Sequence, residues 1–528
     1  MFEPVIDPLP DDPEALKSLL VEREQLLKQQ DRLIAQLQAE VAKLEEERRL
    51  DRARRFAASS EAGDHQYRLF DEAETRAQDA AEVSTEDRGA TVEVAAHTKR
   101  RPKRRPLPAD LPRVVIRHEL PEAEQCCGCG CRMTVIGEKV TEQLDVIPAE
   151  VFILEHHRPT YSCPRCDESI KTTPLPPQPI PKSLASPGLL AHVAVAKYAD
   201  GLPLYRQCQQ FERLGIDLSR NTLASHMVKT GALIEPVIEA LAQHIRSYDI
   251  VQMDETPIQV LKEPGKVAQS KSYMWVMKGG PPRHPAIVYH YDPTRAQRVP
   301  KRLLENYRGY LQTDGYAGYN GILAENDIIG VGCWAHVRRK FMEAKKALPK
   351  ADQAKGNRVQ QALSFIGKLY QLEQALKTVD ADTRKVRRQS EALPILKKFK
   401  TWLTRQSVPP ATYLGKAIGY TLAQWPRLLT YLEDGRLCID NNPVENAIRP
   451  FALGRRNWLF SDSQGGADAS ARLYSLIETA KANGLNDYAY LKWVFTELPK
   501  ATTDSDVQQL LPWNVNADDL DAQLKPPP

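Results

Sequence analysis

The sequence predicts a multi-domain α+β protein with a mixed β-sheet core that is interrupted by a helical insertion. Its 528 residues are too many for one compact core, and this length corresponds to about three or four structural units. Strand-like runs are concentrated between residues 248 and 331, and helical periodicity dominates much of the chain that follows. Leucine-repeat, charged and cysteine-rich segments precede this core, so we expect separate N-terminal modules.

The composition limits the class of protein. The formal net charge is only +4, from 72 Lys and Arg against 68 Asp and Glu, so local clusters must carry any affinity for nucleic acid. The N-terminus lacks a basic-then-apolar secretion signal, and no apolar run is long enough to span a bilayer. We therefore expect a cytoplasmic protein with no membrane partner. Four of the nine cysteines form two Cys-x-x-Cys pairs, which favours metal binding over disulfides.

Residues 1–56 predict a dimerising coiled coil. Between residues 13 and 55 there is no internal Gly or Pro, and apolar side chains recur every seven residues at Leu20, Leu27, Ile34 and Val41. Arg23 and Gln30 interrupt this seam, so a single amphipathic helix that packs on its own protein is the alternative. We expect a parallel homodimer, or a higher oligomer, formed through this segment.

Residues 57–110 predict a disordered basic linker. The segment is polar and Ala-rich without sustained periodicity, so it buries too little surface to fold. Its end concentrates positive charge at Lys99, Arg100, Arg101, Lys103, Arg104 and Arg105. The functional interpretation is sequence-independent contact with DNA phosphates, and the alternative is a solvated linker.

Residues 111–180 predict a zinc-binding ribbon. Two knuckles, QCCGCGC and SCPRC, offer four thiolates at Cys126, Cys129, Cys163 and Cys166, with strand-like segments between them. Cys127 and Cys131 give the first knuckle an alternative register. We expect one structural Zn²⁺.

Residues 183–245 predict a helical DNA-binding segment that resembles a helix-turn-helix. Ser186 and Pro187 suit a helix start, and Gly215 suits a turn between two later helices. The second of these, capped by Ser219, would offer Arg220 and Asn221 to a major groove. The alternative is a helical hairpin that only packs.

Residues 246–343 predict the first part of the catalytic sheet core. Three β-rich runs (residues 248–253, SYMWVMKG and AIVYHYD) are spaced like antiparallel strands, and a helical segment then precedes a fourth run, GYLQTD. This order is typical of a ribonuclease-H-like fold. A right-handed crossover lays the fourth strand parallel to the first, which brings Asp254 and Asp314 together at the carboxyl ends of the two strands.

Residues 344–431 predict a helical insertion, residues 432–485 the second part of the core, and residues 486–528 a C-terminal segment. Asn442 is a suitable N-cap with Pro443 in the first turn, and Glu445 follows three residues after the cap. Glu445 therefore fits a capping box as well as a metal site, and an Asp after a strand is commonly a solvated turn residue. The coincidence of three such acids favours a metal site.

Four motifs resemble those of the insertion-sequence-66 family of DDE transposases. They are DETPIQV with Asp254, TDGYAGY with Asp314, CWAHVRRKF with Cys333 and His336, and NNPVENAIRPFALGRRNWLF with Glu445. The resemblance covers nearly the whole chain. It implies that Asp254, Asp314 and Glu445 form the catalytic triad. It also implies that Cys333 and His336 have a structural role near the site without zinc, and that accessory proteins of the same mobile element are partners.

Such a triad predicts two Mg²⁺ ions, or Mn²⁺ in their place, with Asp254 bridging both and Asp314 and Glu445 each holding one. We expect water to free a 3′-hydroxyl at the end of the element, and that hydroxyl to attack double-stranded target DNA. The basic run Arg338, Arg339 and Lys340 could face phosphate.

Further candidate phosphate contacts are Arg449, Arg455 and Arg456, for which salt bridges or solvated surface are the alternative. The alternative functions are a metal-dependent DNA nuclease without strand transfer and a zinc-containing DNA-binding repressor with an inactive core.

Overall fold

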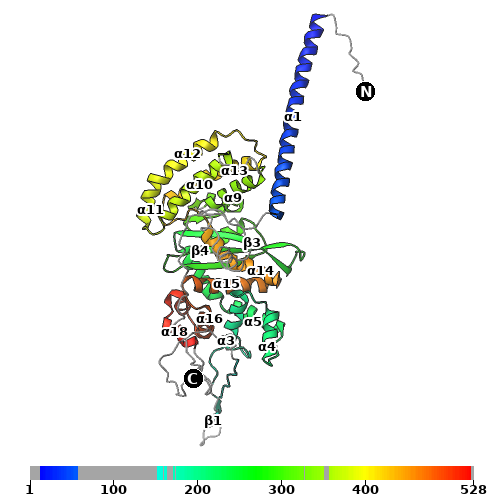
Figure 1. Ribbon diagram of the computed structural model, residues 1–528. Coiled ribbons are helices and arrows are strands. Elements are labelled where there is room, and N and C mark those ends of the chain that lie inside the picture. Colours follow the sequence, from blue (N-terminus) through cyan, green and yellow to red (C-terminus); the bar gives the residue numbers. More distant parts are fainter. Residues whose placement is uncertain are drawn as a thin grey trace, which may run out of the picture. The chain divides into compact units, whose positions relative to one another are not determined.

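The computed structural model describes residues 12–56, 151–157, 160–162, 170–172, 174–325, 327–349 and 356–524. The chain divides into two compact units, residues 1–78 with 176–528, and residues 79–175. The fold of the first unit is mixed α+β, with one mixed sheet and many helices (Figure 1).

In the second unit, described residues 151–157 are exposed and irregular, and β1 (Thr160–Ser162) pairs antiparallel with β2 (Ile170–Thr172). The linker and most of the cysteine-rich segment lie outside the described residues. The zinc-ligand and linker-cation predictions therefore lie there too, namely Cys126, Cys129, Cys163 and Cys166, with Lys99, Arg100, Arg101, Lys103, Arg104 and Arg105.

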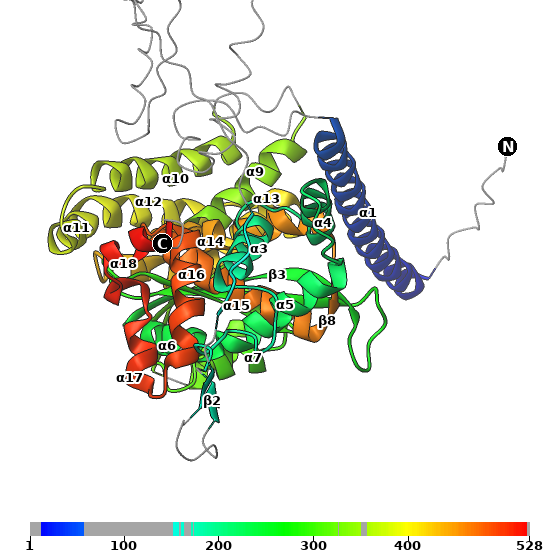
Figure 2. The ribbon, with the colours of Figure 1, turned by 90° about the horizontal axis from the view of Figure 1, so that it is seen from below.

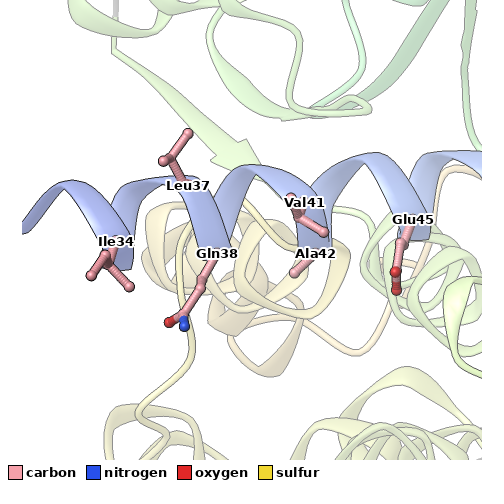
Figure 3. Close-up of a pocket in the computed structure, with 6 residues that line it drawn as sticks. All are labelled: Ile34, Leu37, Gln38, Val41, Ala42 and Glu45. Carbon is pink, nitrogen blue, oxygen red and sulfur yellow. The ribbon is translucent and has the colours of Figure 1, made fainter. Parts of the chain in front are cut away.

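The first helix, α1 (Pro13–Phe56), is 44 residues long. Its heptad side chains Leu20, Leu27, Ile34 and Val41 are each more than half exposed. Figure 3 shows side chains of this stretch, Leu37 and Val41 among them, projecting from the helix surface. Near the end of α1, the Arg49 guanidinium donates to the Ala347 carbonyl, and Leu50 is buried.

Between β2 and the sheet, the structure describes four helices: α3 (Pro187–Tyr198), α4 (Leu204–Arg213), α5 (Arg220–Leu233) and α6 (Glu235–Arg246). The predicted helix starts are confirmed, because Ser186 caps α3 and Ser219 caps α5 through side-chain oxygens that accept backbone N–H groups. Gly215 has a φ of +79° in the turn between α4 and α5, a conformation that favours glycine.

The sheet has the order β5-β4-β3-β6-β7, and β8 joins β3 separately. Its strands are β3 (Ile250–Lys262), β4 (Lys271–Gly279), β5 (Ala286–Asp292), β6 (Gly309–Gln312), β7 (Ile328–Val331) and β8 (Ser461–Ser463). β3, β4 and β5 are antiparallel; after the short α7 (Arg298–Leu303) the chain returns as β6, parallel to β3. This pairing confirms the predicted strand arrangement.

One strand boundary differs from the prediction. The first strand does not end at Asp254, because β3 continues to Lys262 and its pairing with β4 runs on to Gln259. On its other side, β3 pairs with β6 only at residues 250–252 and with β8 only at 260 and 262, among the described strands. Between residues 252 and 260, this side of β3 has no described strand partner. This lets Pro257 sit within the strand, and Asp254 lies on the same unpaired stretch.

Helices pack around the sheet (Figures 1 and 2). Buried apolar side chains form two cores, one that includes most of the sheet and one within the helical insertion. The helical elements between β6 and residue 432 are η4 (Ala317–Tyr319), α8 (Asn320–Glu325), α9 (Trp334–Ala347), α10 (Arg358–Ala375), α11 (Ala381–Arg387), η6 (Arg388–Ala392), α12 (Leu393–Thr404), α13 (Tyr413–Leu429) and η7 (Thr430–Leu432). Trp334 and Phe341 of α9 pack with Phe399 and Trp425 in a core separate from that of the sheet. The α9 helix therefore links the sheet to the helical insertion.

The C-terminal helical elements follow, of which α15, α16 and α18 lie in Figure 1 on the side of the sheet away from the insertion. These elements are α14 (Asn442–Trp458), α15 (Gln464–Ala482), α16 (Asp487–Glu497), η8 (Leu498–Lys500), α17 (Asp504–Gln509), η9 (Pro512–Asn514) and α18 (Ala517–Leu524). The Ser475 and Thr479 hydroxyls of α15 accept N–H groups of the edge strand β5. Among the described helices, none is both long and apolar enough to cross a membrane.

Candidate active site

The register of the parallel strands places Asp254 and Asp314 at equivalent positions. Gln252 pairs with Gln312, so the two acids, each two residues further along the chain, lie at neighbouring positions, Asp254 within β3 and Asp314 just beyond the end of β6. Burial, followed by the negative charges of Glu255, Glu445 and Asp314, raises the pKa of Asp254 from 3.8 to about 8. Asp314 and Glu445 therefore both lie within electrostatic reach of Asp254.

The helical insertion holds the turn that carries Asp314. The Asp314 carboxylate accepts the N–H of Tyr316 at 2.8 Å, and its carbonyl accepts the hydroxyl of Tyr420, from α13, at 2.7 Å. Gly315 has a φ of +87°, and a Cβ there would lie 3.0 Å from that same hydroxyl. Glycine thus allows the insertion to approach the turn closely.

Glu445 lies one residue deeper in its helix than the sequence predicted. Asn441, not Asn442, occupies the N-cap position, and its side chain makes no capping bond. The Asn441 amide instead donates to the carbonyl of Met253, next to Asp254. Because Glu445 is the fourth helical residue, it does not form the predicted capping-box alternative, and its carboxylate is directed elsewhere.

The Glu445 carboxylate faces two basic side chains of α9. His336 Nδ1 lies 3.5 Å from one oxygen, and the Arg339 guanidinium donates to the other at 3.3 Å. Cys333 Sγ lies 3.2 Å from His336 Nδ1 and accepts the Asn441 N–H at 3.2 Å. Among the described residues, one group of three potential metal ligands has all its ligand atoms within 4.8 Å: Cys333, His336 and Glu445.

The protonation of this group without metal follows from its burial. Burial raises the pKa of the Cys333 thiol, and the charges of Asp440 and Glu445 raise it further, so the sulfur stays protonated near neutral pH. Burial lowers the pKa of His336, although Glu445 opposes that shift. Cys333 holds the start of α14 by accepting the Asn441 N–H, and Cys333 and His336 both lie near Glu445 as predicted. Their structural role without metal stays a prediction.

A buried amide network beneath the acids was not predicted. The Gln252 amide donates to Gln312 at 2.8 Å, and the Gln312 amide donates to the Cys438 carbonyl at 2.8 Å, three residues before Asn441. The network joins β3, β6 and the segment that enters α14. Glutamines in strand-like runs carry no specific signal, so only the strand register reveals it.

A second carboxylate next to Asp254 was also missed. The Glu255 side chain is 1% exposed and accepts from the Tyr319 hydroxyl at 2.7 Å and from the Arg295 guanidinium at 2.7 Å. Arg295 stacks 3.7 Å above the ring of Tyr316, the residue whose N–H holds Asp314. Burial raises the pKa of Glu255, and the bonds from Tyr319 and Arg295 oppose that rise.

The arrangement suits a hard divalent cation. Among the described residues, the ligand atoms of Asp254, Asp314 and Glu445 do not form a group within 4.8 Å of one another, although the charges of Asp314 and Glu445 act on Asp254. Two buried oxygens, Asn441 Oδ1 and Glu445 Oε1, have no hydrogen-bond partner. A cation would compensate the repulsion among the acids and use oxygen ligands of the kind that Mg²⁺ prefers.

The predicted DNA contacts are dispersed over the surface. Arg220 and Asn221 are exposed in the first turn of α5. On α14, Arg449 is half-buried and Arg456 is exposed; burial and the charge of Arg456 lower the pKa of Arg455. These roles stay predictions.

Four family models match the chain. The model described as the transposase IS66 family matches residues 182–469, and the IS66 C-terminal element matches residues 475–513. A zinc-finger binding domain of transposase IS66 matches residues 124–167, and a model described as transposase C of IS166 homeodomain matches residues 43–116.

Similar proteins occur in Sinorhizobium fredii. The uncharacterized protein y4jD is 33% identical over 430 residues, which cover 78% of this chain and 82% of that relative. The uncharacterized protein y4hP is 31% identical over 502 residues, which cover 91% of this chain and 88% of that relative. The similarity therefore extends beyond the sheet core to most of the chain.

Proposed function

The chain belongs to the IS66 family of transposases, and on this premise we propose that Asp254, Asp314 and Glu445 form the divalent-metal site of a DDE transposase. The observation that carries the proposal is the electrostatic coupling of three acids from separate segments, seen in the pKa of Asp254, which burial and the other carboxylates raise to about 8. Acids that were incidental turn residues would be separately solvated.

The strand order supports a ribonuclease-H-like core. Three antiparallel strands, a crossover and a parallel fourth strand put Asp254 of β3 and Asp314, just beyond β6, at neighbouring positions, and α14 carries Glu445. The amide of Asn441 ties α14 to β3 beside Asp254.

We further propose that Asp254 bridges two Mg²⁺ ions, or Mn²⁺ ions, and that Asp314 and Glu445 each bind one. When bound, the ions activate the attacking oxygen and stabilise the leaving oxygen of a phosphodiester displacement. Asp254 must release its proton to coordinate, and Glu445 must exchange its contacts with His336 and Arg339 for a metal ligand bond. Water would then cleave a phosphodiester at the element end and leave a 3′-hydroxyl on the element. This hydroxyl would attack a phosphodiester of target DNA and displace the 3′-oxygen of the target strand.

The remaining modules fit this reaction. Cys126, Cys129, Cys163 and Cys166 all fall within the zinc-finger match, and we propose that they hold one structural Zn²⁺. The exposed heptad side chains of α1 would pair with those of a second copy, because apolar stripes repeating every seven residues are buried in coiled coils. A dimer would hold two DNA ends together.

A strand-transfer assay tests the function. Wild type, Asp254→Asn and the control Asp292→Asn are mixed with DNA that carries an element end, target DNA and Mg²⁺. Asp292 is also buried in the sheet, but on β5, where it accepts hydrogen bonds from Thr294. We expect joined product from wild type and control and none from Asp254→Asn. Cleavage without joining would support a nuclease, and DNA binding without either reaction would support a repressor.

A further inference from the structure

A basic groove lies between the first two helices of the insertion. It encloses about 340 Å³ between α9 and α10. Its polar lining consists of Arg338 and Lys345 from α9, with Gln360, Ser364, Lys368 and Gln371 from α10. Among the residues that the structure describes, the lining contains no acidic and no aromatic side chain.

The groove and the candidate active site share helix α9. Arg338 directly precedes Arg339, which donates to Glu445. Arg338 and Lys345 are seven residues apart, so they lie on one stripe of α9. At about 3.6 residues per turn, Arg339 lies about a quarter turn around the helix from this stripe, and His336 lies on the opposite face of α9. At about 1.5 Å per residue, Lys345 lies about 13 Å along the helix from His336.

The facing helix, α10, also contributes polar side chains to the groove. Gln360, Ser364, Lys368 and Gln371 follow one another at four- and three-residue intervals, so they form one polar stripe of α10. Cations flanked by amides and a hydroxyl can neutralise and hydrogen-bond phosphate oxygens. Without an aromatic platform, such a groove has no means of stacking a base.

From this geometry we infer that the groove binds the phosphodiester backbone of the DNA that flanks the reacting phosphate. The inference rests on the proposed function, because it assumes that DNA occupies the candidate active site. Contact with phosphates alone makes this binding independent of sequence. A free polyphosphate shares the same chemistry, and the test must separate it from DNA.

Lysine footprinting of the full chain tests the inference. Asp254→Asn protein is acetylated with and without duplex DNA that carries an element end and flank, and modified lysines are quantified by mass spectrometry. Lys397 and Lys398, exposed on α12 of the same insertion, are the internal control. We expect DNA to protect Lys345 and Lys368 but not the controls, and sodium tripolyphosphate at equal phosphate concentration to protect neither pair.

Equal reactivity of all four lysines with and without DNA would overturn the inference. Protection of Lys345 and Lys368 by tripolyphosphate but not by DNA would also overturn it, because the groove would then be a small-anion site. The assay needs no catalysis. If DNA protects Lys345 and Lys368 but the wild type does not join strands, only the proposed function is refuted. If DNA does not protect these lysines but the wild type joins strands, only the groove inference is refuted.

A variant pair gives a second readout. Lys345→Gln with Lys368→Gln removes two groove charges, and Lys397→Gln with Lys398→Gln removes two elsewhere. At about 0.9 per phosphate contact, the slope of log affinity for duplex DNA against log salt should become shallower by about 1.8 in the groove variant. An unchanged slope in the groove variant, or an equal change in the control, would contradict DNA binding in the groove.

Discussion

Replacing Asp254 with asparagine should stabilise the metal-free protein at alkaline pH. The wild-type carboxylate is buried among other acids, and its pKa is raised from the ordinary 3.8 to about 8. Asparagine has a similar shape, keeps an oxygen that can accept the Glu255 N–H, and carries no charge. It therefore removes the electrostatic cost without opening a cavity.

The pKa gives the sign and size of the effect. Below pH 3.8 Asp254 is protonated in both the folded and the unfolded chain, and the full stability is present. Between pH 3.8 and about 8 the folded chain binds a proton that the unfolded chain releases, so the free energy of unfolding falls as pH rises. At about 1.4 kcal/mol per pKa unit, wild type loses at most about 6 kcal/mol relative to Asp254→Asn above pH 8.

Thermal unfolding in EDTA at a pH near 4 and at a pH above 8 measures this difference. We expect the two proteins to unfold at similar temperatures at the lower pH, and Asp254→Asn at the higher temperature at the upper pH. Mg²⁺ should stabilise wild type more than the variant, because only wild type offers the third carboxylate. Asp462→Asn, at an exposed ion pair with Lys262, is the control and should change little. If the Asp254→Asn variant is no more stable than wild type above pH 8, the reasoning is refuted.

Three further predictions concern other parts of the chain. Glu255→Gln breaks the ion pair that steadies the Asp314 turn and should weaken Mn²⁺ binding about 10-fold by calorimetry, with unchanged affinity arguing against a positioning role. Gly231→Ala places a Cβ 2.6 Å from the Ala469 backbone and should lower stability by about 1–3 kcal/mol in thermal unfolding; no loss would mean that α5 and α15 pack less closely. Leu27→Asp with Ile34→Asp should convert a dimer to monomers in sedimentation, and an unchanged mass would rule out self-association through α1.

The sequence predicted features that local patterns determine. The β-rich runs and the crossover length predicted the parallel pairing that aligns Asp254 with Asp314, and serine caps predicted two helix starts. The N-cap of α14 was displaced by one residue, because the Asn441 side chain bonds to β3 instead of to its own helix. Local capping rules contain no information about such a tertiary partner.

Other features depend on contacts between distant segments. Glu255 meets Arg295 only because the chain leaving β5 returns to β3, and the Asp314 turn meets Tyr420 only once the insertion has folded over it. The groove requires two helices whose relative position is set by their apolar faces. No single segment displays these arrangements, so the sequence indicated basic residues on α9 without indicating a groove.

The central claim is that Asp254, Asp314 and Glu445 bind metal together. Electron paramagnetic resonance titration with Mn²⁺ tests it most directly, on wild type and on Asp254→Asn, Asp314→Asn and Glu445→Gln. We expect two bound ions in wild type and the loss of at least one in each variant, with the largest loss for Asp254→Asn. Wild-type binding in all three variants would contradict a shared metal site.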